Sequence, residues 1–171
     1  MKFKILFLLL STQVFASISN ITTFEADFIQ VITDDKKKEL HYNGHLLASK
    51  PQNAKWIYTT PIKKIIYINR YQATVVEPEI EQVIKRKISS NFDFFKIIEK
   101  AEKIDKNLYI AKYDSTSFTL EVKNDTLISI SYLDQFENSV EITFSNHKQN
   151  QKIDKSLFIP KYPLDFDIIR D

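Results

Sequence analysis

The sequence predicts a single, mainly β (α+β) domain in which one amphipathic helix lies over an antiparallel sheet. Apolar and polar residues alternate along several segments, such as 117–122, which is typical of strands with one buried and one solvated face. Polar clusters at 34–37 and 123–125 separate such segments at intervals of about 8 to 12 residues, the spacing of a meander or a barrel. The segment 91–103 instead has helical periodicity.

Each predicted strand places its apolar residues at every second position. Phe24, Ala26 and Phe28 share one face of the first strand, and Glu25 and Asp27 occupy the other. The same alternation predicts further strands within 40–49, 117–122, 128–132 and 140–144.

The predicted helix spans residues 91–103, and a one-turn helix is expected within 17–22. Ser90 or Asn91 can cap the longer helix, and Asp93 falls in its first turn. Lys100 and Lys103 fall near its end, so these charges complement the helix dipole. The stripe expected to face the sheet consists of Phe94, Phe95, Ile98 and Ala101.

The composition excludes several classes of site. The 171 residues include one glycine, Gly44, and no cysteine. A P-loop, a dinucleotide-binding fingerprint and a hydrolase nucleophile elbow each need at least two glycines. Disulfides, thiol nucleophiles and cysteine-based zinc sites need cysteine. The 24 basic and 22 acidic residues nearly balance, which argues against nucleic-acid binding.

Residues 1–16 have the features of a cleaved signal peptide. Lys2 and Lys4 flank the start of a short apolar run, and Val14 and Ala16 stand three and one positions before a cleavage site. The run is too short to span a bilayer, and a buried N-terminal helix is the alternative. Cleavage would leave 17–171 as one secreted domain with 22 basic and 22 acidic residues.

Two charged groups invite a chemical interpretation but favour a structural one. His41 and His45 would lie ~13 Å apart along a strand, too far to share a metal ion. Glu77, Glu79 and Glu81 alternate along a predicted strand, which favours a solvated face over a catalytic carboxylate pair. We therefore predict no metal site and no catalytic residue.

The aromatic content exceeds what a small sheet and one helix easily cover. The chain has 13 Phe, 8 Tyr and one Trp, many of them at alternating strand positions. The sheet therefore either closes as a barrel with a filled core or leaves a concave apolar face, and composition does not separate these possibilities.

Ordered motifs in the first half of the chain resemble a known family. Residues 24–30 read FEADFIQ and residues 56–58 read WIY. Around them lie Gly44, Leu46, Lys50-Pro51, Pro61 and Glu81-Gln82-Val83. In order and spacing these motifs are similar to the periplasmic outer-membrane lipoprotein carrier proteins of the LolA type. Beyond Val83 the resemblance is one of architecture, with Phe158-Ile159-Pro160 similar to the family's C-terminal strand.

The resemblance implies a strongly curved antiparallel sheet of about eleven strands, forming an unclosed barrel that a few helices cover. Because such a sheet stays open, we expect its apolar cavity to be mostly unfilled. The side chains expected to bind acyl chains are Phe24, Phe28, Leu46, Trp56, Tyr58, Phe118, Leu120, Ile130, Tyr132, Val140, Ile142 and Phe144, with Phe95 and Ile98 from the helix that acts as a lid.

Lys50 stands where the family has arginine before proline. The resemblance implies that this cation ties the lid to the sheet in the unloaded state, by donating to carbonyls at the negative end of the helix. Lysine keeps the charge but lacks the planar guanidinium fork. The alternative is a solvated lysine that begins a strand.

The resemblance also implies a function. A carrier of this type is a monomeric periplasmic chaperone without enzymatic activity or cofactor. It receives acylated lipoproteins from an inner-membrane lipoprotein-releasing ABC transporter and delivers them to an outer-membrane acceptor or its equivalent. The alternative is another periplasmic lipid- or lipopeptide-binding or sensor domain on the same fold. An enzyme acting on acyl chains is disfavoured because no serine has a recognisable elbow or a histidine near it in sequence.

Overall fold

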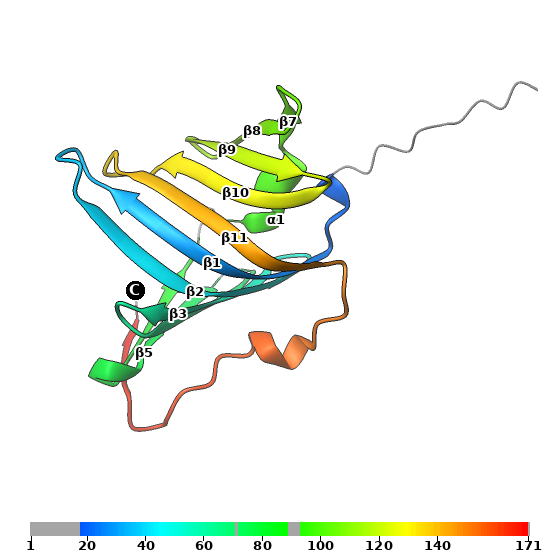
Figure 1. Cartoon of the computed structure of the whole chain (residues 1–171). Helices are drawn as coiled ribbons and strands as arrows, with labels where there is room; N and C mark the ends of the chain where they lie inside the picture. Colours follow the sequence, from blue (N-terminus) through cyan, green and yellow to red (C-terminus); the bar gives the residue numbers. More distant parts are fainter. Residues whose placement is uncertain (1–17, 71, 89–92, 171) are drawn as a thin grey trace, which may run out of the picture.

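The computed structural model describes residues 18–70, 72–88 and 93–170, which build one strongly curved twelve-stranded sheet (Figure 1). The expected signal peptide and the proposed capping residues Ser90 and Asn91 lie outside the described residues. The strands are β1 Thr23–Thr33, β2 Glu39–Ser49, β3 Asn53–Thr60, β4 Lys64–Asn69, β5 Gln72–Glu77, β6 Gln82–Lys87, β7 Glu102–Lys103, β8 Leu108–Tyr113, β9 Thr116–Lys123, β10 Thr126–Leu133, β11 Ser139–Gln149 and β12 Asp167–Arg170.

The sheet has the order β12-β6-β5-β4-β3-β2-β1-β11-β10-β9-β8-β7. Neighbouring strands are antiparallel except at one edge, where β12 pairs in parallel with β6. The edge strands β12 and β7 are not hydrogen-bonded to each other in the part that the structure describes, so the barrel is unclosed, as predicted. The sheet has twelve strands, against about eleven expected.

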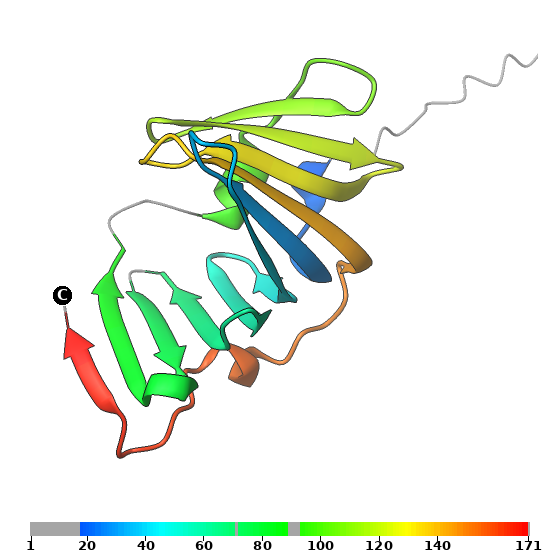
Figure 2. The ribbon, with the colours of Figure 1, turned by 60° about the vertical axis from the view of Figure 1, so that its left-hand side comes forward.

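The concave side of the sheet carries the core, as the alternating pattern predicted. In β9 the buried positions are Phe118, Leu120 and Val122, and every second position from Phe24 to Phe28 is buried in β1. The helix α1, Phe94–Glu99, lies on this concave side (Figure 2). The short 3-10 helix η1, Ile18–Asn20, packs against α1, and it confirms the expected single turn before β1.

The helix is shorter than predicted. It occupies 94–99 rather than 91–103, and Asp93 is its N-cap rather than a residue of its first turn. The Asp93 carboxylate accepts hydrogen bonds from the backbone N–H groups of Phe95 and Lys96, which satisfies two of the unpaired donors. After Lys100 the chain leaves the helix because Glu102 and Lys103 pair with β8, a strand contact that helical periodicity does not reveal.

Two further sequence interpretations need correction. Glu77 ends β5, Glu79 lies in the 3-10 helix η2, Pro78–Ile80, and Glu81 caps η2 with a φ of 54°. The three residues therefore do not share one strand face. Pro78 explains the break, because proline cannot donate to a sheet ladder. Phe158 ends the 3-10 helix η3, Lys155–Phe158, and Ile159 is its C-cap, so Phe158 to Pro160 is not a strand. The last strand lies later, at β12.

A C-terminal arm follows β11 and reaches β6 along the outside of the sheet (Figure 2). Tyr162 and Phe166 of this arm pack against a second small core of Tyr67, Val76 and Val83. Alternate side chains of a strand point to opposite faces. Tyr67 lies between Ile66 and Ile68, which pack on the concave core, so the second core lies on the other face. The arm therefore covers the convex face of β4 to β6.

Each helix in the described ranges falls short of the length and apolarity needed to cross a membrane.

Candidate functional site

The fourteen predicted acyl-binding residues come together in one cluster on the concave face. Thirteen of them are buried, and Tyr132 is partly buried and packs against the others. The sheet register explains the clustering: Leu46 pairs with Trp56, Ile130 with Ile142, and Phe118 with Tyr132 across neighbouring strands. Directly opposed residues point to the same face of a sheet, so local alternation in each strand builds one continuous apolar wall.

Gly44 allows the densest part of this wall to form. Phe28 in β1 pairs with Gly44 in β2, which pairs with Tyr58 in β3. The Phe28 ring lies 5.1 Å from the rings of both Trp56 and Tyr58, at nearly perpendicular angles. A Cβ at position 44 would collide with this ring and with the carbonyl oxygen of Ile57. The single glycine of the chain therefore provides the space for Phe28.

An apolar cavity of about 170 Å³ remains within the wall. Its lining includes four predicted residues and three that sequence reasoning missed: Trp56, Tyr58, Tyr132 and Ile142, with Gln30, Ile66 and Ile68. The expectation of a mostly unfilled cavity is wrong for this conformation, because the protein's own side chains fill most of the concave side. The alternation of side chains along β1 and β4 could have identified the missed residues, since Gln30 follows Phe28 by two positions and Ile68 follows Ile66 by two.

Helix α1, the predicted lid, packs against the concave side near the start of β1. Phe94, Phe95, Ile97 and Ile98 are all buried. The Phe94 ring lies 5.2 Å from that of Phe24 and 6.5 Å from that of Phe144, so it is wedged into the aromatic wall. Phe94 and Ile97 were absent from the predicted acyl-binding set. The lid therefore occupies space next to the wall with its own apolar side chains.

Lys50 contacts the lid. Its Nζ lies 2.6 Å from Oε1 of Glu99, the last residue of α1, and 5.9 Å from the centre of the Phe95 ring. The side chains of Lys50 and Glu99 are 30% and 49% exposed. This ion pair joins Lys50 to a side-chain carboxylate at that end of the helix. Donation from Lys50 to helix carbonyls stays a prediction.

The chain is similar to known lipoprotein carriers over most of its length. The family profile described as outer membrane lipoprotein carrier protein LolA matches residues 19–124. A Campylobacter jejuni protein named outer-membrane lipoprotein carrier protein is 40% identical over 166 residues, which cover 97% of each chain. The chain belongs to the LolA family.

Another LolA-family relative, the outer-membrane lipoprotein carrier protein of Helicobacter pylori strain J99, is 33% identical over 155 residues, covering 90% of this chain and 83% of the relative. Among solved structures, an uncharacterised conserved protein from Thermus thermophilus matches 90% of this chain and 93% of its own, with a TM-score of 0.56. At 9% identity, this match shows the shared fold alone.

A second hollow of about 670 Å³ lies between the β8–β9 and β10–β11 turns. Phe118 and Tyr132 line it together with turn residues that include Phe136, which is 74% exposed. Tyr132 lines both this hollow and the smaller apolar cavity. The smaller apolar cavity therefore lies next to a larger hollow at the hairpin end of the sheet.

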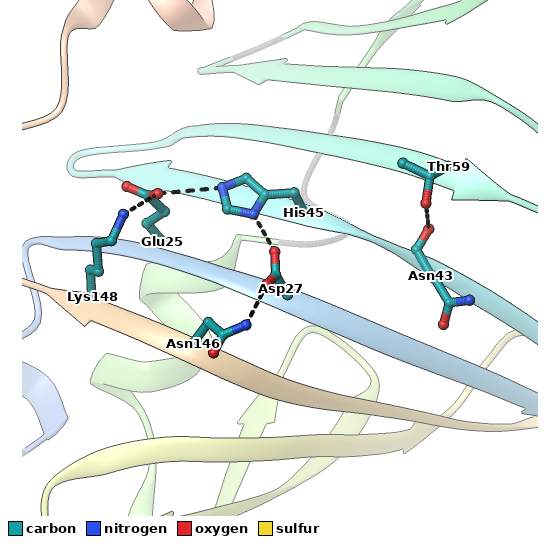
Figure 3. Close-up of polar contacts among 7 residues, drawn as sticks. All are labelled: Glu25, Asp27, Asn43, His45, Thr59, Asn146 and Lys148. Carbon is teal, nitrogen blue, oxygen red and sulfur yellow. Dashed lines mark hydrogen bonds and ion pairs between the residues drawn. The ribbon is translucent and has the colours of Figure 1, made fainter.

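The convex face carries a polar network (Figure 3). His45 Nδ1 lies 2.7 Å from Asp27 Oδ1, and His45 Nε2 lies 3.5 Å from Glu25 Oε1. Asn146 donates to Asp27, and Lys148 donates to Glu25. Within the described residues, His, Asp and Glu side chains form no group of three that could hold a metal ion. His45 thus links two carboxylates across β1 and β2, and His41 instead lies next to Glu39.

Proposed function

We propose that this protein is a periplasmic carrier that binds the acyl chains of lipoproteins released from the inner membrane and delivers them to an outer-membrane acceptor. The observation that carries the proposal is membership of the LolA family at 40% identity over nearly the whole chain. The concave aromatic wall under a lid supports the proposal, because it offers apolar surface that can shield acyl chains from water. Burial of each methylene contributes about 0.8 kcal/mol of binding free energy.

The cavity must enlarge before it can hold such a cargo. A cavity of about 150 Å³ holds a molecule the size of benzene, and the cavity here is about 170 Å³. Opening requires α1 to withdraw Phe94, Phe95, Ile97 and Ile98 from the wall. Each fully buried side chain of this kind contributes about 1.5–3 kcal/mol, so the lid is held by at most about 6–12 kcal/mol.

Cargo can supply this free energy. Burial of roughly 8 to 15 methylenes offsets the loss of lid contacts, and three acyl chains hold dozens. The half-exposed Lys50–Glu99 pair contributes about 0–1 kcal/mol, so it adjusts the lid equilibrium without dominating it. In this proposal Lys50 is the latch of the unloaded state, and entry of the acyl chains breaks the latch.

Loading and release depend on partners in this proposal. An inner-membrane lipoprotein-releasing ABC transporter supplies the energy, because one glycine in the chain cannot provide the P-loop of a nucleotide site. The acceptor at the outer membrane, or its equivalent, then takes the acyl chains. The protein itself acts as a monomer and catalyses no reaction.

Mass spectrometry of material bound to the protein after expression in a periplasm tests the proposal. Triacylated lipoprotein bound to the purified protein is the expected result. Free fatty acid or phospholipid alone would instead favour the alternative lipid-binding or sensor role. N-terminal sequencing tests the location, since a periplasmic protein cleaved after Ala16 begins at or near Ser17. Intact Met1 in the membrane fraction would contradict it.

A further inference from the structure

The apolar cavity contains a buried hydrogen-bonded pair. Gln30 and Tyr58 both line it, and they are only 8% and 9% exposed. The Tyr58 hydroxyl donates to Gln30 Oε1 at 2.9 Å. Burying an amide and a phenol costs free energy unless they are hydrogen-bonded, whereas apolar side chains at both positions would build a dry wall without that cost. A cavity that bound only hydrocarbon would not need these two polar groups.

The chemistry of the pair suits an incoming carbonyl. A glutamine amide has two N–H donors in addition to its oxygen, and a phenol has one O–H donor that can change partners. Burial raises the pKa of the Tyr58 hydroxyl far above its usual range, and it also raises the pKa of Tyr132 in the same lining. Both hydroxyls therefore keep their protons throughout the neutral pH range.

The hydrogen-bonding groups lie at one end of the wall. Gln30, Tyr58 and Tyr132 stand within three residues of the ends of β1, β3 and β10, where those strands reach the hairpin turns. Lys64, the first residue of β4, places its Nζ 4.4 Å from the centre of the Tyr58 ring at the same end. At the opposite end of these strands, Lys50 directly follows β2 and Phe24 is the second residue of β1, and both contact the lid. The hydrogen-bonding groups of the cavity lining thus lie near the hairpins, at the far end of the wall from the lid.

We propose that Gln30 and Tyr58 hydrogen-bond the ester carbonyls of a diacylglyceryl group, and so hold its polar end at the hairpin end while its chains extend toward the lid. This inference rests on the proposed function and adds to it a basis for selecting ester-linked lipid over plain hydrocarbon. Diacylglyceryl esters occur in acylated lipoproteins and in phospholipids, so the ester carbonyl is the recognised group and the test must separate the two sources.

Displacement of an environment-sensitive apolar dye from the full-length mature protein provides the assay. The probes are a synthetic diacylglyceryl lipopeptide, the same peptide with ether-linked chains, and a short-chain diacyl phospholipid. Tyr58→Phe removes the hydroxyl but keeps the ring that packs 5.1 Å from Phe28. We expect this variant to bind the ester lipopeptide roughly three- to tenfold more weakly. Binding of the ether-linked peptide should stay within about twofold of wild type.

Tyr42→Phe is the matched control. The Tyr42 ring lies 5.6 Å from that of Tyr58, but Tyr42 is not among the residues lining the cavity. This control should bind both lipopeptides as the wild type does. The double variant Gln30→Leu with Tyr58→Phe removes both polar groups, so it avoids leaving a buried amide unpaired and keeps the test valid if Tyr58→Phe is unstable.

The outcomes separate this inference from the function on which it rests. Equal weakening for ester and ether peptides, or no weakening for either, would overturn the role of the pair while leaving the carrier function intact. Failure of the wild type to bind either lipopeptide would overturn both. Selective weakening with the lipopeptide supports recognition of lipoprotein esters, and selective weakening with the phospholipid alone supports recognition of the same carbonyls in a membrane lipid.

Discussion

Separating Lys50 from Glu99 tests whether this pair acts as a latch. Glu99→Gln removes the charge with little change in shape, and Lys50→Leu removes the cation with little loss of apolar bulk. The two atoms that pair are 2.6 Å apart, and both side chains are partly solvated. The Lys50 ammonium also lies 5.9 Å from the Phe95 ring centre, so Lys50→Leu removes more than the pair.

The expected magnitudes follow from this exposure. An ion pair at such a site contributes up to about 1 kcal/mol, so Glu99→Gln should raise the open population of the lid by at most roughly fivefold. In 1 M salt the Debye length falls to about 3 Å, and the difference from wild type should shrink. Lys50→Leu should have the larger effect, because a cation over an aromatic ring adds about 0.5–1 kcal/mol.

Hydrogen exchange measured by mass spectrometry reports the lid directly. The amides of Ile97 and Lys100 donate to the carbonyls of Asp93 and Lys96 at 3.0 Å, and they exchange when α1 opens or unfolds. Lys50→Arg should protect these amides at least as well as wild type. In a transfer assay, Lys50→Leu should accept cargo but release it slowly, so loaded carrier accumulates. The coupling would be refuted if the effects of Lys50→Leu and Glu99→Gln on lid opening were additive in the double variant. It would also be refuted if the effect of Glu99→Gln did not change with salt.

Three further predictions concern the wall, the lid and the convex network. Gly44→Ala should lower the free energy of unfolding by about 1–3 kcal/mol in urea, because the new methyl overlaps the Phe28 ring; an unchanged midpoint would contradict this packing. Phe94→Ala should cost about 3–5 kcal/mol in the same assay, and a loss below about 1 kcal/mol would show that the ring is not wedged as described. The amide of Asn146, with His45, holds the pKa of Asp27 below its usual range. The stabilisation is therefore present above about pH 4 and is lost as the pH falls through the folded-state pKa. In urea titrations, Asp27→Asn should lose stability less steeply than wild type as the solution is acidified, and parallel curves would argue against the assignment.

The residues that sequence reasoning placed correctly are those set by local periodicity. Alternation assigned Phe118, Leu120 and Ile130 to one face, and that face is buried. Periodicity gave the helix the wrong length. The helical segment ends because Glu102 pairs with Ile110, which lies eight positions later on another strand. It also missed Ile66 and Ile68, since the strand containing them was not identified from its apolar run.

The sequence by itself determined the mainly β class, the inward faces and the family, because side-chain period and motif spacing are properties of the chain. The tertiary structure alone decided how much of the concave side is empty, since that volume depends on how Phe94 and Ile97 of the lid pack against the wall. It also decided that Lys50 meets Glu99, 49 positions away, and that Gln30 meets Tyr58. Such contacts depend on the curvature of the sheet and on the approach of distant segments, which no local pattern encodes.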